Sequence, residues 1–575
     1  MEGIDPSRGG TVRFGVYELD VRGGELRRNG IRVKLQEQPF QILQILLERP
    51  GEVITRDELR QKIWPSDTFV DFDHGINNAI KRLRAALSDS AEKPRYIETV
   101  ASRGYRFVAS INASPRRIES LAVLPLENLA RDAEQEYFAE GLTEALITTL
   151  AKIGQLRIVS RTSAMQYKGI HKPVGEIARE LEVDAIVEGT VLRAGHRIRV
   201  TAQLIEAEKG THLWAQSYER DLSDVLTLQA ELAQAIAREV RVKLTPRERA
   251  HITRVRPVDP EAYETYLRGR YHWKRRNREG LGKAVQRFQE AIAKDPTYAA
   301  AYSGLADCLS VLGWWGFISP EEGCGKAKRL AMKALELDHG LADAHVSLAW
   351  VNTFYDYDFS AAEREFEHSI KLSPSHATAH LWLGLYLALM GRHEDGNTEI
   401  KCAIRLEPYS MVNQVSGFAL LFACRYDQAI VQFEEALDLD SSFAPAHWGL
   451  SGAYSFKSLH ELAIAAGRRA VELSHGATLF VAILGEAFAA AGYRDEARDI
   501  LEQLHQASKQ RYVSPYAVGR IYATLGETDE ALRWLEIAYR EHTAHMVCLK
   551  TDPRFNGLRS DSRFQDLLRR INFPP

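Results

Sequence analysis

The sequence predicts a multidomain α+β protein in three parts: a small domain of strands and helices, a small α/β domain, and a long all-helical array. Its 575 residues are too many for a single hydrophobic core. Strand-like and helix-like segments alternate up to about residue 245, whereas the chain from about residue 262 is helical and repeats every 34 residues. We therefore expect domains at residues 11–110, 119–245 and 262–550, with a capping segment at 551–575.

Short strands lie at both ends of the N-terminal domain. Before residue 36, the runs VRFGVYELD, GELRRNG and IRVKL predict three strands separated by turns at Gly23-Gly24 and Asn29-Gly30. The Asn-Gly pair is a strong hairpin signal. Near the end of the domain, RYIETVASRGYRFVA predicts two more strands, joined at residues 101–104.

Three helices are expected between these strands. The first is PFQILQILLERP, which carries an apolar face. The second, TRDELRQKIW, begins with a capping box, because Glu58 follows Thr55 at the required spacing. The third runs from Gly75 to Leu87, and its apolar residues recur at helical spacing: Ile76, Ile80, Leu83 and Leu87.

The other face of the third helix carries the candidate DNA contacts: Asn77, Asn78, Lys81, Arg82 and Arg84. An α-helix fits the major groove, where Arg, Lys and Asn hydrogen-bond to base edges. Arg82 is the first choice for a base contact, Asn78 and Arg84 come second, and Lys81 is assigned to phosphate. A basic run taken alone is more often a solvated helix face, so the order of the surrounding elements has to support this interpretation.

That order, strands followed by three helices and a final hairpin, resembles the OmpR-type winged-helix DNA-binding family over residues 12–109. The run ITRDELRQKIWPSDTFVDFDHGINNAIKRLRAALSD fits without a gap, and the hairpin ETVASRGYRF corresponds to the family's wing. The resemblance implies a sequence-specific transcriptional regulator that binds double-stranded DNA. It places Arg103 and Arg106 near the DNA backbone or the minor groove, although many relatives carry their basic residue where this chain has Ala101.

The resemblance also implies a contact with RNA polymerase. In the family, the loop between the second and third helices can make this contact, and here the loop spans about residues 65–73. Its acidic residues, Asp67, Asp71 and Asp73, would suit a basic protein surface. Residues 1–110 carry 18 Lys and Arg against 16 Asp and Glu, so binding to DNA requires that the basic side chains gather on one side.

Residues 119–245 predict strands alternating with helices. LAVLPL and LRIVSR are expected strands, and EYFAEGLTEALITTLAKIG and VGEIARELEV are expected helices. Three longer strands follow, with turns near Gly195 and Gly210 that predict antiparallel hairpins, and a helix near 223–243 closes the domain. The segment resembles the N-terminal α/β domain of TolB-like proteins, and related segments are sometimes labelled nucleotide-cyclase-like.

A cyclase needs two metal-binding carboxylates on adjacent strands. The acidic residues Glu127, Asp132, Glu134 and Glu136 form no such pair in the sequence, and neither a P-loop nor GxGxxG is present. We therefore expect no catalytic residues and no cofactor. A module for packing or dimerisation and a sensing pocket remain the alternatives for this domain.

The helical part contains an internal repeat, whose second helices share three mostly small residues spaced by four and then three. These are Ala284-Phe288-Ala291, Ala327-Ala331-Ala334, Ala362-Phe366-Ser369, Gly396-Ile400-Ala403, Ala429-Phe433-Ala436, Ala463-Gly467-Ala470, Ala497-Leu501-Leu504 and Ala531-Leu535-Ala538. The pattern resembles tetratricopeptide repeats and implies a superhelix of about eight helix pairs that binds a protein partner. The first interval is 43 residues long and predicts an insertion around GWWGFISPEEG, in which Trp314 and Trp315 would either anchor a peptide or pack in the core.

His345, His380 and His447 recur at one position of the repeat. Helices pack roughly 10 Å apart, so these side chains are too distant to share a metal ion, and we expect them to fill an aromatic position. The five cysteines form no CxxC and are expected to be small buried residues in a reducing cytosol: Cys308, Cys324, Cys402, Cys424 and Cys548.

No apolar stretch reaches the ~18 residues that a membrane span needs, and the best candidate is Ala379–Met390, inside a repeat. We expect a cytoplasmic bacterial signal-transduction protein that regulates transcription and receives its input through the middle domain or the repeats. Self-association is expected, because paired half-sites raise the affinity of a small DNA-binding head. The alternative is a scaffold protein whose winged helix contacts protein instead of DNA.

Overall fold

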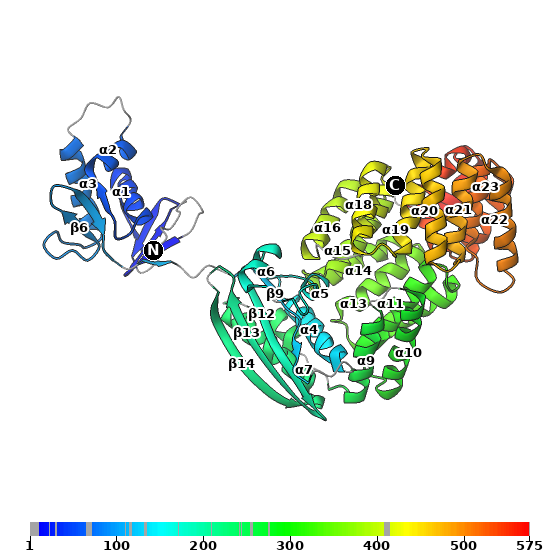
Figure 1. Ribbon diagram of the computed structural model, residues 1–575, viewed down its shortest axis with the longest axis horizontal. Coiled ribbons are helices and arrows are strands. Elements are labelled where there is room, and N and C mark those ends of the chain that lie inside the picture. Colours follow the sequence, from blue (N-terminus) through cyan, green and yellow to red (C-terminus); the bar gives the residue numbers. More distant parts are fainter. Residues whose placement is uncertain are drawn as a thin grey trace. The chain divides into compact units, whose positions relative to one another are not determined.

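The computed structural model describes the chain except for residues 1–10, 22, 29–30, 65–71, 110, 114–117, 131–134, 171, 209, 241, 243, 254–256, 274–276, 408–413 and 574–575. The chain divides into two compact units, residues 1–117 and 118–575. The first unit corresponds to the N-terminal domain. The second unit holds the α/β domain together with the helical array (Figure 1).

Two small sheets build the first unit. The antiparallel sheet β4-β3-β2-β1-β8 contains β1 (Thr11–Phe14), β2 (Tyr17–Asp20), β3 (Glu25–Arg28), β4 (Ile31–Val33) and β8 (Ile111–Ala113). The sheet β5-β7-β6 contains β5 (Val53–Thr55), β6 (Ile97–Val100) and β7 (Gly104–Phe107). The prediction of one strand over VRFGVYELD is wrong, because Gly15 adopts a left-handed φ of 56° and turns the chain between β1 and β2. The predicted Asn29-Gly30 turn lies outside the described residues.

The three predicted helices are present as α1 (Glu37–Glu48), α2 (Arg56–Ile63) and α3 (Phe72–Ala86). The capping box of α2 is confirmed, since Thr55 and Glu58 each accept a hydrogen bond from the backbone N–H of the other. The apolar faces of the helices meet in one core that also includes strand residues. Its members from α3 are Ile76, Ala79, Ile80 and Leu83, and the fourth predicted residue, Leu87, joins the core directly after the helix.

A six-stranded mixed sheet forms the α/β domain. Its strands are β9 (Ser120–Val123), β10 (Glu127–Asn128), β11 (Arg157–Ile158), β12 (Ala185–Ala194), β13 (Arg197–Glu206) and β14 (Thr211–Asp221), in the order β11-β9-β12-β13-β14 with β10 beside β12. The predicted hairpins are confirmed, with Gly195 and Gly210 at positive φ in the turns. The helices are α4 (Glu136–Leu150), α5 (Arg161–Met165), α6 (Val174–Glu180), the 3-10 turn η3 (Leu222–Asp224), α7 (Val225–Glu239) and α8 (Pro246–Thr253).

Among the described residues, eight pairs of neighbouring helices form the array. Figure 1 shows how these helices are arranged. The first helices are α9 (Pro260–Trp273), α11 (Ala299–Trp314), α13 (Ala342–Val351), α15 (Ala377–Leu389), α17 (Gln414–Phe422), α19 (Ala444–Phe456), α21 (Thr478–Ala490) and α23 (Pro515–Leu525). The second helices are α10 (Arg278–Lys294), α12 (Lys326–Leu337), α14 (Phe359–Leu372), α16 (His393–Leu406), α18 (Tyr426–Leu439), α20 (His460–Leu473), α22 (Arg494–Ala507) and α24 (Thr528–Arg540). All predicted small-residue triplets are buried, which lets the paired helices approach closely.

The α/β domain packs directly against the array. Arg270 of α9 forms an ion pair with Glu144 of α4, and Arg193 of β12 pairs with Glu264 of α9 at 2.9 Å. Ser160, which follows β11, donates its backbone N–H to the carbonyl of Leu406 at 3.0 Å. The regions expected as separate domains at 119–245 and 262–550 therefore belong to one compact unit.

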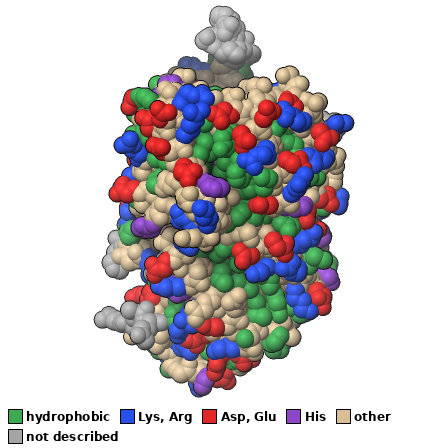
Figure 2. Space-filling view, turned by 90° about the vertical axis from the view of Figure 1, so that its right-hand side faces the viewer, with side chains coloured by type: hydrophobic (Ala, Val, Ile, Leu, Met, Phe, Trp, Pro, Cys, Tyr) green, Lys and Arg blue, Asp and Glu red, His purple; other side chains and the backbone are tan. Residues whose placement is uncertain are grey.

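Further short elements complete the array: the π-helical turns η4 (Glu321–Gly325) and η5 (Asn352–Asp356), the 3-10 turns η7 (Ala544–Cys548) and η8 (Pro553–Leu558), and α25 (Ser562–Ile571). The second helix pair holds η4 between α11 and α12, where the insertion was expected. Trp314 and Trp315 both pack against other aromatic side chains of the array. On the face of the array shown in Figure 2, acidic and basic side chains are interspersed around apolar ones.

Two of the recurring histidines, His345 and His380, join the two helices of a pair, whereas Nε2 of His447 lies 3.2 Å from the Ser441 carbonyl. Nδ1 of His345 lies 2.6 Å from the Glu365 carboxylate and Nδ1 of His380 lies 2.6 Å from that of Glu399, while Nε2 of each faces a backbone carbonyl. Cys424 corrects the cysteine prediction, because it is exposed, at a φ of 58°, between α17 and α18. Within the described residues, no helix is both long and apolar enough to cross a bilayer.

Candidate DNA-binding surface

The side of α3 opposite the core carries a continuous exposed stripe. Residues three or four positions apart are neighbours on the surface of a helix. The exposed residues that share this side of α3 are His74, Asn77, Asn78, Lys81, Arg82 and Ala85. The opposite side is closed, since Ile76, Ile80 and Leu83 are at most 2% exposed. No described side chain of the stripe is acidic, so this face of α3 suits a polyanion.

Asn77 connects the stripe to two neighbouring elements. Its Oδ1 accepts hydrogen bonds from the hydroxyl of Tyr105 on β7 at 2.9 Å and from Nη2 of Arg56 on α2 at 3.2 Å. The Arg56 guanidinium also lies over the Tyr105 ring, 5.4 Å from its centroid. Asn77 remains exposed, but these contacts fix its amide, and its first role in the unit is to hold α2, α3 and the hairpin together.

Arg84 lies on the edge of α3 that faces the hairpin, and it is only half-exposed. Its Nη2 donates to the backbone carbonyl of Ile97 at 2.8 Å and to Oγ1 of Thr99 at 2.9 Å, both on β6. A guanidinium held in this way ties the wing to the helix. The structure therefore favours a positioning role for Arg84 over the base contact expected from the sequence.

Arg82 lies on the other edge of the stripe and is exposed. Its guanidinium hydrogen-bonds the side-chain amide of Gln36, the exposed N-cap residue of α1. A surface hydrogen bond from a guanidinium to an uncharged amide exchanges readily with solvent or a ligand. Asn78 and Lys81, between the two edges, are exposed and make no side-chain hydrogen bond or ion pair with any other residue that the structure describes.

The wing is the hairpin of β6 and β7, whose tip at residues 101–103 is exposed. Arg103 occupies this tip, beside Ser102 at a φ of 60°. Arg106 on β7 is paired with Glu98 on β6, with its Nε and Nη2 at 2.8 and 2.6 Å from the same carboxylate oxygen. The structure thus separates the two predicted wing contacts into an exposed arginine and a paired one.

Gly104 explains how the wing joins β5. A Cβ at this position would lie 2.0 Å from the carbonyl oxygen of Ile54, so only glycine lets β7 approach β5 this closely. The start of the wing is fixed by Asp89, whose carboxylate accepts the backbone N–H groups of Arg95, Tyr96 and Ile97. Sequence reasoning missed these residues, together with Gln36 and Arg56, because nothing in the local pattern marks contacts between distant segments.

The expected polymerase-contact loop is not described in full. Asp67 and Asp71 lie outside the described residues, and for Asp73 only the backbone, in the first turn of α3, is described. Another acidic residue of the unit, Glu58, caps α2 and pairs with Arg49 at 2.8 Å. Hydrogen bonds from Arg49 and Thr55 lower the pKa of the Glu58 carboxyl to about 2.

The strands β1 to β4 ahead of three helices, the exposed polar face of α3 and the anchored hairpin of β6 and β7 define a winged-helix DNA-binding unit. The comparisons with known proteins agree: residues 30–107 match the family "Transcriptional regulatory protein, C terminal", and the unit is an OmpR-type DNA-binding domain. Residues 117–237 match the family "HilA/YgeH-like transcriptional regulator, second domain", and residues 355–396 match a tetratricopeptide repeat. The chain thus combines the domains of a transcriptional regulator with a repeat array.

Three curated relatives match different shares of the chain. The chain is 34% identical to "Putative adenylate cyclase 3" of Rhizobium meliloti over 59% of this chain and 56% of that protein. It is 25% identical to "Transcriptional regulator HilA" of Salmonella typhimurium over 74% of each chain. It is 31% identical to "Transcriptional activator CadC" of Escherichia coli over 18% of this chain and 20% of that protein. The matched families are those of transcriptional regulators, although one relative carries a cyclase name.

Proposed function

We propose that this protein is a sequence-specific transcriptional regulator in which α3 lies in the major groove of double-stranded DNA. The exposed stripe of Asn78, Lys81 and Arg82, backed by a closed core and tied to the wing through Asn77 and Arg84, is the observation that carries the proposal. Because helix and wing are held together, they can meet the duplex as one preformed surface. Preformed binding surfaces lose less conformational entropy on association.

We assign a role to each residue of the stripe from the contacts that it makes. Arg82 and Asn78 are assigned to base edges, where Arg pairs with guanine and Asn with adenine. Lys81 is assigned to phosphate, and Arg103 at the wing tip to the backbone or minor groove. Arg106 is a weaker candidate, because Glu98 already neutralises it. Asn77 and Arg84 support the surface from its edge.

The other partners follow from the remaining parts of the chain. The repeats are assigned to a protein partner that supplies the regulatory input. The acidic loop with Asp67, Asp71 and Asp73 is assigned to RNA polymerase, on the family resemblance alone. Pairing of two copies on DNA and a location in the bacterial cytoplasm complete the proposal.

We assign no reaction to the α/β domain. A cyclase would place two metal-binding carboxylates on adjacent strands. Here the carboxylate of Asp184 accepts hydrogen bonds from Glu119 and Ser120 at the start of β9, and Glu188 on β12 is hydrogen-bonded to the Gln203 amide of β13 at 2.6 Å. Each carboxylate faces a neutral group across the strand pair. Nucleotide turnover by the purified chain would contradict this assignment.

Selection of genomic DNA fragments by the full-length chain tests the proposal. We expect one or a few fragments to be enriched over competitor DNA at moderate salt, and enrichment to be lost in Arg82→Ala. The matched control is Arg364→Ala, which removes an exposed arginine from α14 in the other unit. If no fragment is enriched, or if regulation survives Arg82→Ala unchanged, the proposal is wrong. The alternative, a scaffold protein whose winged helix contacts protein instead of DNA, would then be favoured.

A further inference from the structure

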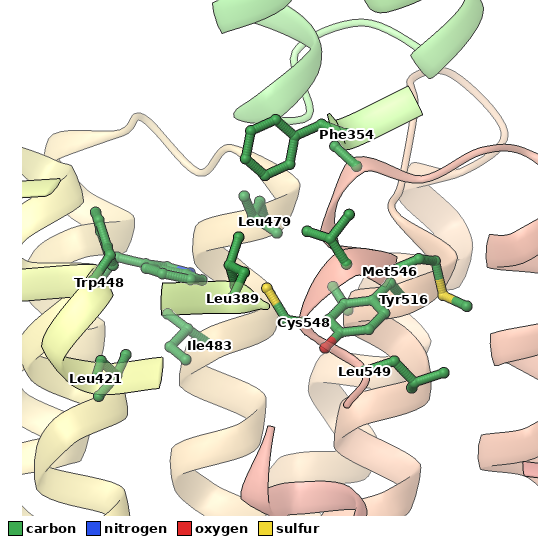
Figure 3. Close-up of a cluster of buried hydrophobic side chains, with 14 of the residues drawn as sticks. Phe354, Leu389, Leu421, Trp448, Leu479, Ile483, Tyr516, Met546, Cys548 and Leu549 are labelled. Atoms are coloured by element: carbon green, nitrogen blue, oxygen red, sulfur yellow. The ribbon is translucent and has the colours of Figure 1, made fainter. Parts of the chain in front are cut away.

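The inner side of the array is occupied by the end of the chain. We call residues 541–573 the C-terminal segment, and we call the array side chains around it the inner surface: Trp314, Phe354, Trp448, Tyr516, Arg520 and Glu486. Figure 3 shows Met546, Cys548 and Leu549 of the segment lying between Phe354, Leu389, Trp448, Ile483 and Tyr516, which come from several helix pairs. Segment and inner surface share one buried cluster that extends from Val346 to Ile571.

His545 is the centre of the aromatic contacts. Its ring stacks on Trp314 of α11, with 4.3 Å between the centroids, and lies 6.1 Å from Tyr516 of α23 and 6.4 Å from Trp448 of α19. Trp314 lies at the expected insertion, so the side chain considered as a peptide anchor does hold a peptide segment, the chain's own. The expectation that residues 551–575 only cap the end of the array is too narrow, because the segment also touches α14, where Phe573 stacks on Phe359.

A buried ionic cluster adds specific recognition. Glu486 of α21 pairs with Arg520 of α23 at 2.6 Å and with Arg554 of the segment at 2.8 Å. Arg554 also pairs with Asp552 at 3.0 Å, and Asp552 accepts a hydrogen bond from the Tyr516 hydroxyl at 3.2 Å. The side chains of Glu486 and Arg520 are only 3% and 4% exposed. Charges this deep require matched partners, so the segment fits by chemistry as well as by shape.

The segment differs from the rest of the array in its backbone. Where it crosses the inner surface it forms only the short 3-10 turns η7 and η8, in place of a helix pair with close-packed small residues. Its contacts are therefore mainly side-chain contacts, which another segment of matching chemistry can also make. On the inner surface the Glu486 carboxylate neutralises Arg520, so these side chains offer no excess positive charge to a polyanion, and the site favours a peptide over a nucleic acid.

We propose that the inner surface is the partner-binding site of the array and that the C-terminal segment occupies it when the partner is absent. The partner is a protein that presents an extended segment with an aromatic or imidazole ring followed, seven and nine residues later, by a carboxylate and an arginine. This inference rests on the proposed function, in which the repeats bind a protein. An empty inner surface would expose many apolar side chains, so the partner exchanges with the segment and does not enter a vacant groove.

The test uses the full-length chain and a fluorescent synthetic peptide of residues 541–573. In His545→Ala/Arg554→Ala the resident segment is weakened while the inner surface is unchanged, and we expect the peptide to bind at least ~10-fold more tightly than to the wild type. A control peptide with Arg554→Glu, which faces Glu486 with a like charge, should lose at least ~10-fold in affinity. Adding Glu486→Gln to the double variant should weaken binding of the unmodified peptide.

Two results would overturn the inference. One is that the double variant binds the peptide no better than the wild type does. The other is that the double variant loses the cooperative thermal transition of residues 118–575, which would make the segment an ordinary part of the core. DNA binding by the same variants is measured in parallel, because it belongs to the first unit. If the chain exchanges the peptide as expected but does not bind DNA, the DNA-binding function is contradicted and the inference about the inner surface is not.

Discussion

The stripe on α3 and the inner surface of the array use similar side chains in opposite ways. Asn78, Lys81 and Arg82 point outward with few internal contacts. Arg520 and Arg554 are buried against Glu486, with 4% and 10% of their side chains exposed. The first surface is left open for a ligand outside the molecule, whereas the second is filled by the molecule itself. Arginine content therefore does not identify a binding surface; what matters is whether its partners are already present.

Glu486 should show the largest effect. Glu486→Ala leaves Arg520 and Arg554 buried without their shared carboxylate, and we expect a loss of about 3–5 kcal/mol in the free energy of unfolding of the second unit. Urea unfolding followed by tryptophan fluorescence measures it, because eight of the nine tryptophans lie beyond residue 118. The control is Glu530→Ala, whose exposed pair with Arg533 should be worth less than about 1 kcal/mol. Equal effects for both variants would contradict the buried pairing.

Arg82→Ala should have the next largest effect, and on DNA affinity only. Loss of a base contact costs about 1–3 kcal/mol in binding and relaxes the preference at one base pair. Fluorescence anisotropy with the selected site and with single-base variants measures both quantities. Unfolding of the chain should stay unchanged, since the Arg82 contact with Gln36 is exposed. If Arg82→Ala weakens binding to all DNA sequences equally, Arg82 contacts a phosphate group and not a base.

His545 makes the second unit sensitive to acid. Burial, together with the nearby Arg520, lowers the pKa of the imidazole to about 3, whereas in the unfolded chain it is about 6.5. The unfolded state then binds the proton first, so stability present at neutral pH is lost as the pH falls below about 6.5. By pH 5 the loss attributable to this group should reach about 2 kcal/mol. The difference between wild type and His545→Phe in urea unfolding at pH 7 and pH 5 isolates it; an identical pH dependence would exclude this role.

Arg84→Ala tests the reassignment of that residue. The side chain's hydrogen bonds to Ile97 and Thr99 join α3 to β6, and each such bond contributes about 0.5–1.5 kcal/mol. We expect lower stability of the first unit and weaker DNA binding, with the base preference unchanged. Amide hydrogen exchange of the wing, compared between Arg84→Ala and Arg103→Ala, separates positioning from contact. If Arg84→Ala changes the base preference with normal exchange, Arg84 contacts a base after all.

Lys81→Ala should give the smallest effect. Loss of one phosphate contact should reduce the slope of log affinity against log salt by about 1, with little change in sequence preference. Titrations at several salt concentrations measure the slope, and Arg364→Ala is again the matched control. An unchanged slope would remove Lys81 from the DNA-binding surface.

The sequence predicted what depends on local pattern. Ile76, Ile80 and Leu83 fixed the buried side of α3 and therefore its exposed side, and the 34-residue period placed every helix pair. The sequence did not predict that the Arg84 side chain points toward β6. The Ile97 carbonyl that accepts its hydrogen bond lies in a separate element, further along the chain. Nor did the sequence predict that the C-terminal segment lies against the inner surface, where the hydrogen bond from the Tyr357 hydroxyl to the Thr543 carbonyl joins residues 186 positions apart. Contacts of this kind depend on the curvature of the whole array, which no single repeat encodes.

The most direct measurement places a photo-crosslinker at position 78, in the middle of the exposed stripe on α3, in the full-length chain bound to its selected DNA fragment. We expect efficient crosslinking to the duplex at one defined base position, and none from the same group at Met332, an exposed residue of α12. Absence of a crosslink from position 78 on DNA that the chain binds would show that another surface contacts the duplex.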